Sequence, residues 1–87
     1  MIFAVYWNFE PEYRNEVSTR FKETGGKPPD GVKMICRWHH VEDCEGFCVC
    51  ESNDPVAMGK WVREWSDLMT FRIVPVVDDE GVSKIIA

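Results

Sequence analysis

The chain has 87 residues, of which 45% are hydrophobic and 13% aromatic, and its formal net charge is −5. This length fits a single domain, residues 1–87, and the composition excludes intrinsic disorder, which goes with few aromatic and β-branched residues. The acidic balance argues against nucleic acid as a partner, because such binding depends on Lys and Arg that neutralise phosphates. The first apolar run, residues 2–9, is too short for a membrane span and follows no basic region. We therefore expect a cytoplasmic protein with no membrane partner.

The first part of the chain predicts a strand followed by a helix. Residues 2–9 are dense in β-branched and aromatic side chains, which is typical of a strand. Residues 12–24 predict an amphipathic helix in which Glu16 is placed to pair with Arg20. Its apolar residues recur every four positions, at Tyr13, Val17 and Phe21. Gly25 then favours a left-handed helix end.

The middle of the chain predicts a β-hairpin. Residues 32–41 and 46–52 both alternate between apolar and polar positions, and the acidic segment 42–45 lies between them. Pairing opposite charges across the hairpin suggests a register in which Arg37 faces Glu51. The same register sets Trp38 opposite Cys50 and His40 opposite Cys48.

The last part predicts a second helix and a fourth strand. Asp54, followed by a proline, is a strong helix start, and the helical pattern runs to about Leu68. The predicted buried stripe centres on Met58, Val62, Trp65 and Met69, with Trp61 and Leu68 on its flank. Gly59, in the middle of this helix, suggests a close approach by another element or a ligand. Pro75 within residues 70–77 favours an edge strand. The tail, 79–87, is either a frayed end or a short arm that packs on a partner.

The predicted fold class is α+β, with the ferredoxin-like βαββαβ order. In this arrangement a four-stranded antiparallel sheet carries two helices on one face, strands one and three are central, and the core ends near residue 78. The sheet is apolar on both faces: strand one presents Val5 and Trp7 on one side and Ala4 and Tyr6 on the other. A second copy that packs sheet to sheet would cover the remaining face, so we expect a homodimer.

Several segments together resemble a known family. These are Glu23-Thr24-Gly25-Gly26, Pro28-Pro29-Asp30-Gly31-Val32, Arg37-Trp38-His39, Gly46-Phe47 and Glu64-Trp65. With this spacing, the chain up to Asp78 resembles the small proteins grouped as domain of unknown function thirty-three-oh-three. The resemblance implies a dimeric α+β barrel, whose relatives include cofactor-free oxygenases, haem-degrading oxygenases, isomerases and members with no known activity.

The resemblance also suggests some site residues. In similar oxygenases an asparagine on the first strand and a tryptophan in the cleft hold the substrate, and the counterparts here are Asn8 and either Trp61 or Trp38. Haem-degrading relatives take their iron ligand from a histidine on the second long helix, and residues 54–68 contain none.

One hypothesis, consistent with the resemblance, is a small-molecule cleft between sheet and helices. Neighbouring strand residues face opposite sides, so His39 and His40 cannot serve one site, and we predict His40 as the acid-base candidate. The predicted cleft is lined by Tyr6, Asn8, Trp38, His40 and Trp61. The chain shows no export signal and would meet a reducing compartment, so we expect four free thiols. The cysteines lack the paired C-x-x-C spacing of zinc sites, so we expect no metal, and we expect no cofactor.

Three functions stay open at this point. The first is a protein that binds a small aromatic or apolar ligand, and the second is a non-catalytic module for protein interaction or dimerisation. The third is an enzyme like the cofactor-free monooxygenases. Whether the chain is an enzyme is not decided by its sequence.

Overall fold

The computed structural model describes the whole chain, residues 1–87, and has the predicted βαββαβ order. Its elements are β1 (Ile2–Asn8), the short 3-10 helix η1 (Pro11–Tyr13), α1 (Arg14–Thr24), β2 (Val32–His39), β3 (Glu45–Ser52), α2 (Pro55–Arg63), β4 (Thr70–Val76) and α3 (Asp79–Ile86). None of these helices is both long enough and apolar enough to cross a bilayer.

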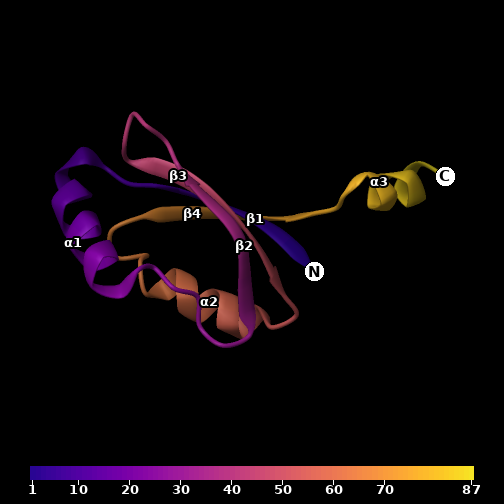
Figure 1. Cartoon of the computed structure of the whole chain (residues 1–87), viewed down its shortest axis with the longest axis horizontal. Coiled ribbons are helices and arrows are strands. Elements are labelled where there is room, and N and C mark those ends of the chain that lie inside the picture. Colours follow the sequence, from indigo (N-terminus) through magenta and orange to yellow (C-terminus); the bar gives the residue numbers. More distant parts are fainter.

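The four strands form one antiparallel sheet in the order β2-β3-β1-β4. The predicted placement of the first and third strands at the centre is confirmed, and so is the edge position of the strand that contains Pro75. Figure 1 shows α1 and α2 together on one side of the twisted sheet. The opposite side of the sheet carries no helix.

The helices cover the face to which Val5, Cys48 and Cys50 belong. These three residues pack with Ala57, Met58 and Trp61 of α2 in the main core cluster. A second, smaller cluster joins α1 to the segment that follows α2, through Val17, Trp65 and Leu68. The two clusters fix α1 and α2 relative to the sheet.

The helix-free side of the sheet is called the open face below. Because successive strand residues alternate between faces, this face carries apolar and polar side chains. The apolar ones are Ile2, Ala4, Tyr6, Cys36, Trp38, Phe47, Val49, Val74 and Val76, and the polar ones are Asn8, Lys33, Glu45, Glu51, Thr70 and Arg72. Tyr6 and Phe47 pack with ring centroids 6.1 Å apart. Even so, Tyr6 is 46% exposed and Trp38 is 64% exposed.

The predicted hairpin register is wrong by several residues. Arg37 lies opposite Cys48 rather than Glu51, and Trp38 lies opposite Phe47 rather than Cys50. His40 lies beyond the end of β2, so it is not paired with Cys48. A β-bulge between Met34 and Cys36 explains the error in facing, because one extra residue reverses which side chains face the helices, but it shifts the pairing by only one residue. Met34 faces the helices before the bulge, whereas Arg37 and His39 face them after it.

The start of the second helix is confirmed, but its predicted end and buried stripe are not. The Asp54 side chain accepts hydrogen bonds from the backbone N–H groups of Val56 and Ala57, as a capping residue does. The regular helix ends at Arg63, and turns lead from there to Leu68. Trp61, predicted on the flank, is only 8% exposed and belongs to the main core cluster. Gly59 has open space where a side chain would stand, so no element approaches it closely.

The tail forms a helix of its own, α3, rather than a frayed end. The Asp78 side chain accepts a hydrogen bond from the Gly81 N–H at its start. Figure 1 shows α3 standing well away from the sheet and from the other helices. Its apolar side chains are exposed: Val82, Ile85 and Ile86.

Candidate functional site

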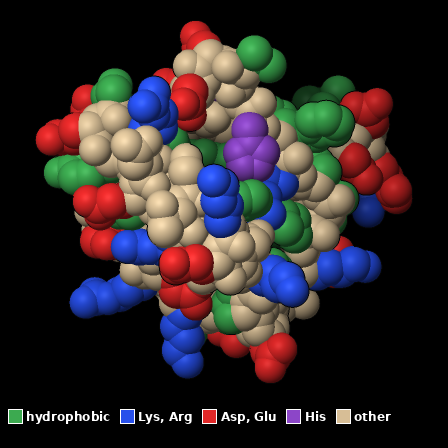
Figure 2. Space-filling model, turned by 60° about the vertical axis from the view of Figure 1, so that its left-hand side comes forward, with side chains coloured by type: hydrophobic (Ala, Val, Ile, Leu, Met, Phe, Trp, Pro, Cys, Tyr) green, Lys and Arg blue, Asp and Glu red, His purple; other side chains and the backbone are tan.

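A cavity of about 400 Å³ lies between the sheet and the two helices. Twelve of its 20 lining residues are hydrophobic, and α1, α2 and the sheet all contribute to its walls. This volume falls within the range of about 300 to 1,000 Å³ that small-molecule sites occupy. In Figure 2 a histidine and basic side chains surround a hollow in which hydrophobic side chains are visible. We call this cavity the cleft.

Three strands meet at the aromatic end of the cleft because one of them contributes a glycine. Trp7 of β1 and His39 of β2 both lie opposite Gly46 of β3. The Trp7 and His39 rings make an edge-on contact across this glycine, with centroids 5.5 Å apart. A Cβ atom on Gly46 would collide with the Trp7 ring and the Trp38 carbonyl oxygen. The absent side chain therefore lets residues of non-adjacent strands touch.

The His39 ring is held from its other side by α1. Phe21 packs against it at 5.5 Å, again nearly perpendicular. No hydrogen bond within the chain involves the His39 imidazole. Desolvation, and then the positive charge of Arg37, lower the pKa of His39 below its usual value. The ring is accordingly neutral at pH 7, with one nitrogen able to accept a proton or a hydrogen bond.

Arg37 places a guanidinium group in the cleft wall. Its Nη1 donates to the Gly26 carbonyl at 2.8 Å and its Nη2 donates to the Gly25 carbonyl at 2.9 Å. It also lies over the Phe21 ring, 4.9 Å from the centroid. Both glycines have positive φ angles, and a Cβ on Gly26 would lie 2.8 Å from the Arg37 Nη1. The carbonyl groups at the helix end predicted at Gly25 thus also accept the hydrogen bonds of Arg37.

Cys48 lies on the sheet wall of the cleft, next to Arg37 in register. Burial raises the pKa of its thiol to about 12, and neighbouring Cys50 adds to the effect. Burial also raises the pKa of Cys50. Since the thiolate is the reactive form, Cys48 is a small apolar surface at neutral pH and not a nucleophile.

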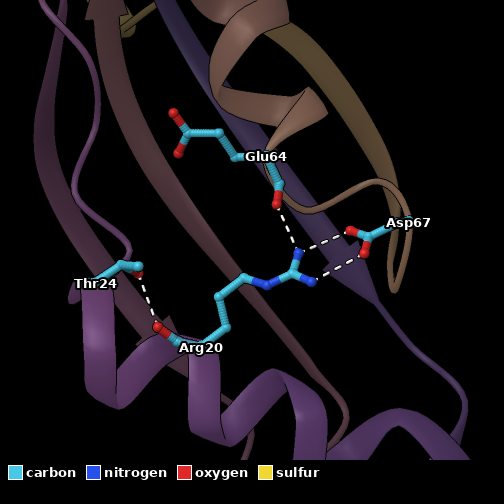
Figure 3. Close-up of polar contacts among 4 residues, drawn as sticks. All are labelled: Arg20, Thr24, Glu64 and Asp67. Atoms are coloured by element: carbon cyan, nitrogen blue, oxygen red, sulfur yellow. Dashed lines mark hydrogen bonds and ion pairs between the residues drawn. The ribbon is translucent and has the colours of Figure 1, made fainter.

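An ion pair ties the two helical walls of the cleft together (Figure 3). Arg20 of α1 donates to both carboxylate oxygens of Asp67, at 2.7 and 2.9 Å, and to the Glu64 carbonyl oxygen at 2.7 Å. Its guanidinium also lies 5.6 Å from the Trp65 ring centroid. The predicted partner of Arg20, Glu16, makes no salt bridge with it. The pair therefore fixes α1 to the end of α2 instead of stabilising α1 alone.

The hairpin loop forms the acidic rim of the cleft. His40 Nδ1 lies 3.5 Å from a Glu42 carboxylate oxygen and 3.2 Å from a Glu45 carboxylate oxygen. Ligand atoms of these three side chains lie within 4.8 Å of one another, but all three residues are exposed. Exposed acidic groups are common on protein surfaces, and this arrangement by itself does not indicate a metal site.

The structure brings only two of the five predicted site residues to the cleft, His40 and Trp61. Tyr6 and Trp38 lie on the open face, and the bulge is the reason for the error at Trp38. Asn8 is exposed at the end of β1, where its Oδ1 accepts a hydrogen bond from Thr70 at 2.9 Å. The expectation that all five residues line one cleft is therefore corrected.

Among the cleft residues that sequence reasoning missed are Trp7, Arg37 and His39, on which the proposals below depend. The sequence did not decide which side of the first strand faces the helices, and the prediction placed Tyr6 and Asn8, on the side opposite Trp7, in the cleft. Arg37 and His39 are two residues apart on β2 and therefore face the same side of the sheet. The correct strand register would have placed both of them on the side that the helices cover. The signal for that register is the run of apolar residues Val32, Met34 and Ile35, which breaks strict alternation at the bulge.

Comparisons with known proteins agree with this fold. The family model described as Domain of unknown function (DUF3303) matches residues 1–87. The solved structure of Rv0793 from Mycobacterium tuberculosis is similar, with a TM-score of 0.55 and 12% sequence identity over 91% of this chain and 98% of that chain. At this identity the likeness concerns the fold alone. No curated protein matches the sequence. The match over the full length shows that the chain belongs to the family described as Domain of unknown function (DUF3303).

Proposed function

We propose that this protein binds a small, largely aromatic molecule in the cleft between its sheet and its two helices. The observation that carries the proposal is the 400 Å³ cavity, whose walls combine hydrophobic residues with an arginine and a neutral histidine. Small-molecule sites have this composition: an apolar lining for affinity and a few polar groups for orientation. Trp7, Phe21 and Trp61 supply flat surfaces on different sides of the space.

A pair of substitutions on α1 tests the proposal. Ser18 is exposed and lines the cleft, whereas its neighbour Thr19 is exposed but lines a separate surface hollow. Ser18→Phe should obstruct the cleft without disturbing the core, and Thr19→Phe adds the same ring outside it. Titration with 2-naphthalenemethanol, followed by calorimetry, should show binding that S18F weakens about tenfold or more and T19F leaves unchanged. No binding by the wild type across a panel of planar aromatic alcohols and planar aromatic carboxylic acids would remove the proposal.

A second proposal concerns assembly: we infer that two copies pack through their open faces. Both helices cover the other side of the sheet, so the aromatic side chains of the open face are left in solvent. Soluble monomers rarely leave a contiguous apolar patch of this kind exposed. The helix α3 supports the same inference, because an isolated helix of eight residues is marginal in water and this one exposes its apolar side.

Sedimentation of charge-bearing variants tests the assembly. Trp38→Glu places a charge on the open face at a residue that is 64% exposed, so the subunit itself should stay folded. Val41→Glu, at a fully exposed residue of the hairpin loop, is the matched control. We expect the wild type and V41E to sediment as dimers and W38E as a monomer. A wild-type monomer at about 100 μM would contradict the inference.

A further inference from the structure

Arg37 is a cation in the cleft wall without a negative partner. No carboxylate of the chain lies within 4.0 Å of its guanidinium, and its two hydrogen bonds go to neutral carbonyl groups. A guanidinium carries five N–H donors, so three remain for other acceptors. The other arginine that is packed between elements, Arg20, has a carboxylate on two of its nitrogens. Arg37 therefore differs from a structural ion pair.

The partial burial of Arg37 disfavours its charged form. Burial lowers the pKa of Arg37, which shows that the protein penalises the charged form, although an arginine stays protonated. Arg37 is partly buried, so its guanidinium has lost part of its hydration and an anion in the cleft would replace it. Partial exclusion of water also strengthens the attraction between Arg37 and such an anion.

The remaining charged groups of the cleft limit the number of negative charges that the anion can carry. Lys22 adds a second positive charge from α1, whereas Asp43 and Glu45 add negative charges from the hairpin loop. His39, two residues along from Arg37, is neutral at pH 7. The cleft thus has a basic side and an acidic rim, and a polyanion such as a nucleotide would meet repulsion there. A single negative group on an apolar body avoids that repulsion.

We propose that the ligand of the cleft is an aromatic carboxylic acid, with its carboxylate on Arg37 and its ring among Trp7, Phe21 and Trp61. This inference rests on the proposed function, because it names the class of molecule that the same cleft accepts. Arginine suits a carboxylate by geometry as well as by charge. The neutral imidazole of His39 lies beside the ring position and can accept a hydrogen bond from a hydroxyl group on the ligand.

Two probes of equal shape separate charge from shape. 2-Naphthoate and 2-naphthalenemethanol share the fused ring and differ in the group that would meet Arg37. Calorimetry at pH 7 should show the wild type binding naphthoate about tenfold or more tightly than the alcohol. Arg37→Gln should bring the two affinities within about twofold, chiefly by weakening the binding of naphthoate. Arg63→Gln, which removes an exposed charge from the end of α2 outside the cleft, should keep the full preference.

The outcomes distinguish failure of the carboxylate assignment from failure of the proposed ligand site. Equal affinity for the two probes in the wild type overturns the carboxylate assignment and keeps the cleft as a binding site. Failure of both probes to bind removes both proposals. Should R37Q not fold, Arg37→Lys retains the charge without the fork of donors. A preference for naphthoate that is reduced but present in R37K supports the assignment, and an unchanged preference overturns the role of the guanidinium.

Discussion

Trp7 and His39 touch across a strand that lies between them, with ring centroids 5.5 Å apart, because residue 46 of that strand is a glycine. This contact ties the edge strand β2 to the central strand β1 on the helix side of the sheet. It also sets the aromatic end of the cleft and presents the His39 ring to Phe21 of α1. The shape of the cleft at this end therefore depends on a missing side chain.

Gly46→Ala should destabilise the fold and disturb the cleft. The new methyl group meets the Trp7 ring and the Trp38 carbonyl oxygen, so it forces a shift in a packed region. Overpacking of this kind costs about 1 to 3 kcal/mol, measurable by urea denaturation. Gly59→Ala is the control, since nothing lies within 4 Å of its added methyl group, and it should instead stabilise α2 by about 0.5 to 1 kcal/mol. Equal effects of the two substitutions would contradict the contact across residue 46.

The free energy of unfolding should depend on pH through His39. Desolvation and Arg37 lower its pKa in the folded state, whereas the unfolded value is about 6.5. Between these two values the unfolded chain binds more protons, so stability falls as the pH drops from about 6.5 through the folded pKa. His39→Gln should flatten the stability profile between pH 7 and pH 5, as measured by urea denaturation at each pH. His40→Gln keeps the His39 ring, so a profile as flat as that of H39Q would point away from His39.

The cysteines should differ in their reaction with iodoacetamide. Cys48 and Cys50 are buried and burial raises the pKa of both thiols, so at pH 8 they should stay unmodified in the native protein. Cys44 is only half-buried in the hairpin loop and should be modified before them. Pulse labelling and mass spectrometry would give the order, and labelling in urea should remove it. Native Cys48 that reacts as fast as in urea would show that the cleft wall is open.

The ion pair between Arg20 and Asp67 should support the helical walls. Arg20→Met should lower the melting temperature, and added salt should reduce the difference from the wild type because the Asp67 carboxylate is 58% exposed. The hydrogen bonds from Arg20 hold the pKa of Asp67 below its usual value, so the pair stabilises the protein at neutral pH and is lost as the pH falls through that pKa. NMR titration should find a higher Asp67 pKa in R20M. Arg14→Met, on the same helix without a salt bridge, should leave the Asp67 pKa in place.

The order of elements was predictable because local patterns encode it. The strand that contains Tyr6, the glycine helix end at residue 25 and the Asp54 cap each follow from nearby residues. The side chains that form the cleft depend instead on the pairing between strands. One extra residue at the bulge of β2 reverses the side of the sheet that Arg37 and His39 face. A prediction based on strict alternation of apolar and polar residues assumes that a strand has no bulge, so it assigns these side chains to the wrong side.

The second helix shows the same limit in another form. The predicted stripe assumes a regular helix as far as Leu68, but regular turns end at Arg63. Beyond that point the chain bends, so Trp61, Trp65 and Leu68 all reach the interior. Tertiary packing determines where the helix ends and how the chain bends, and the spacing of hydrophobic residues in an ideal helix does not predict this bend.

The four tryptophans provide the most direct test of the cleft as a ligand site. Trp7, Trp61 and Trp65 line the cleft, whereas Trp38 lies on the open face. Each indole N–H gives a separate NMR signal, so titration of the protein with 2-naphthoate can be followed at all four rings. The account predicts saturable shifts of the three cleft signals and little change at Trp38. Shifts confined to Trp38, or no shift at any ring up to about millimolar probe, would contradict it.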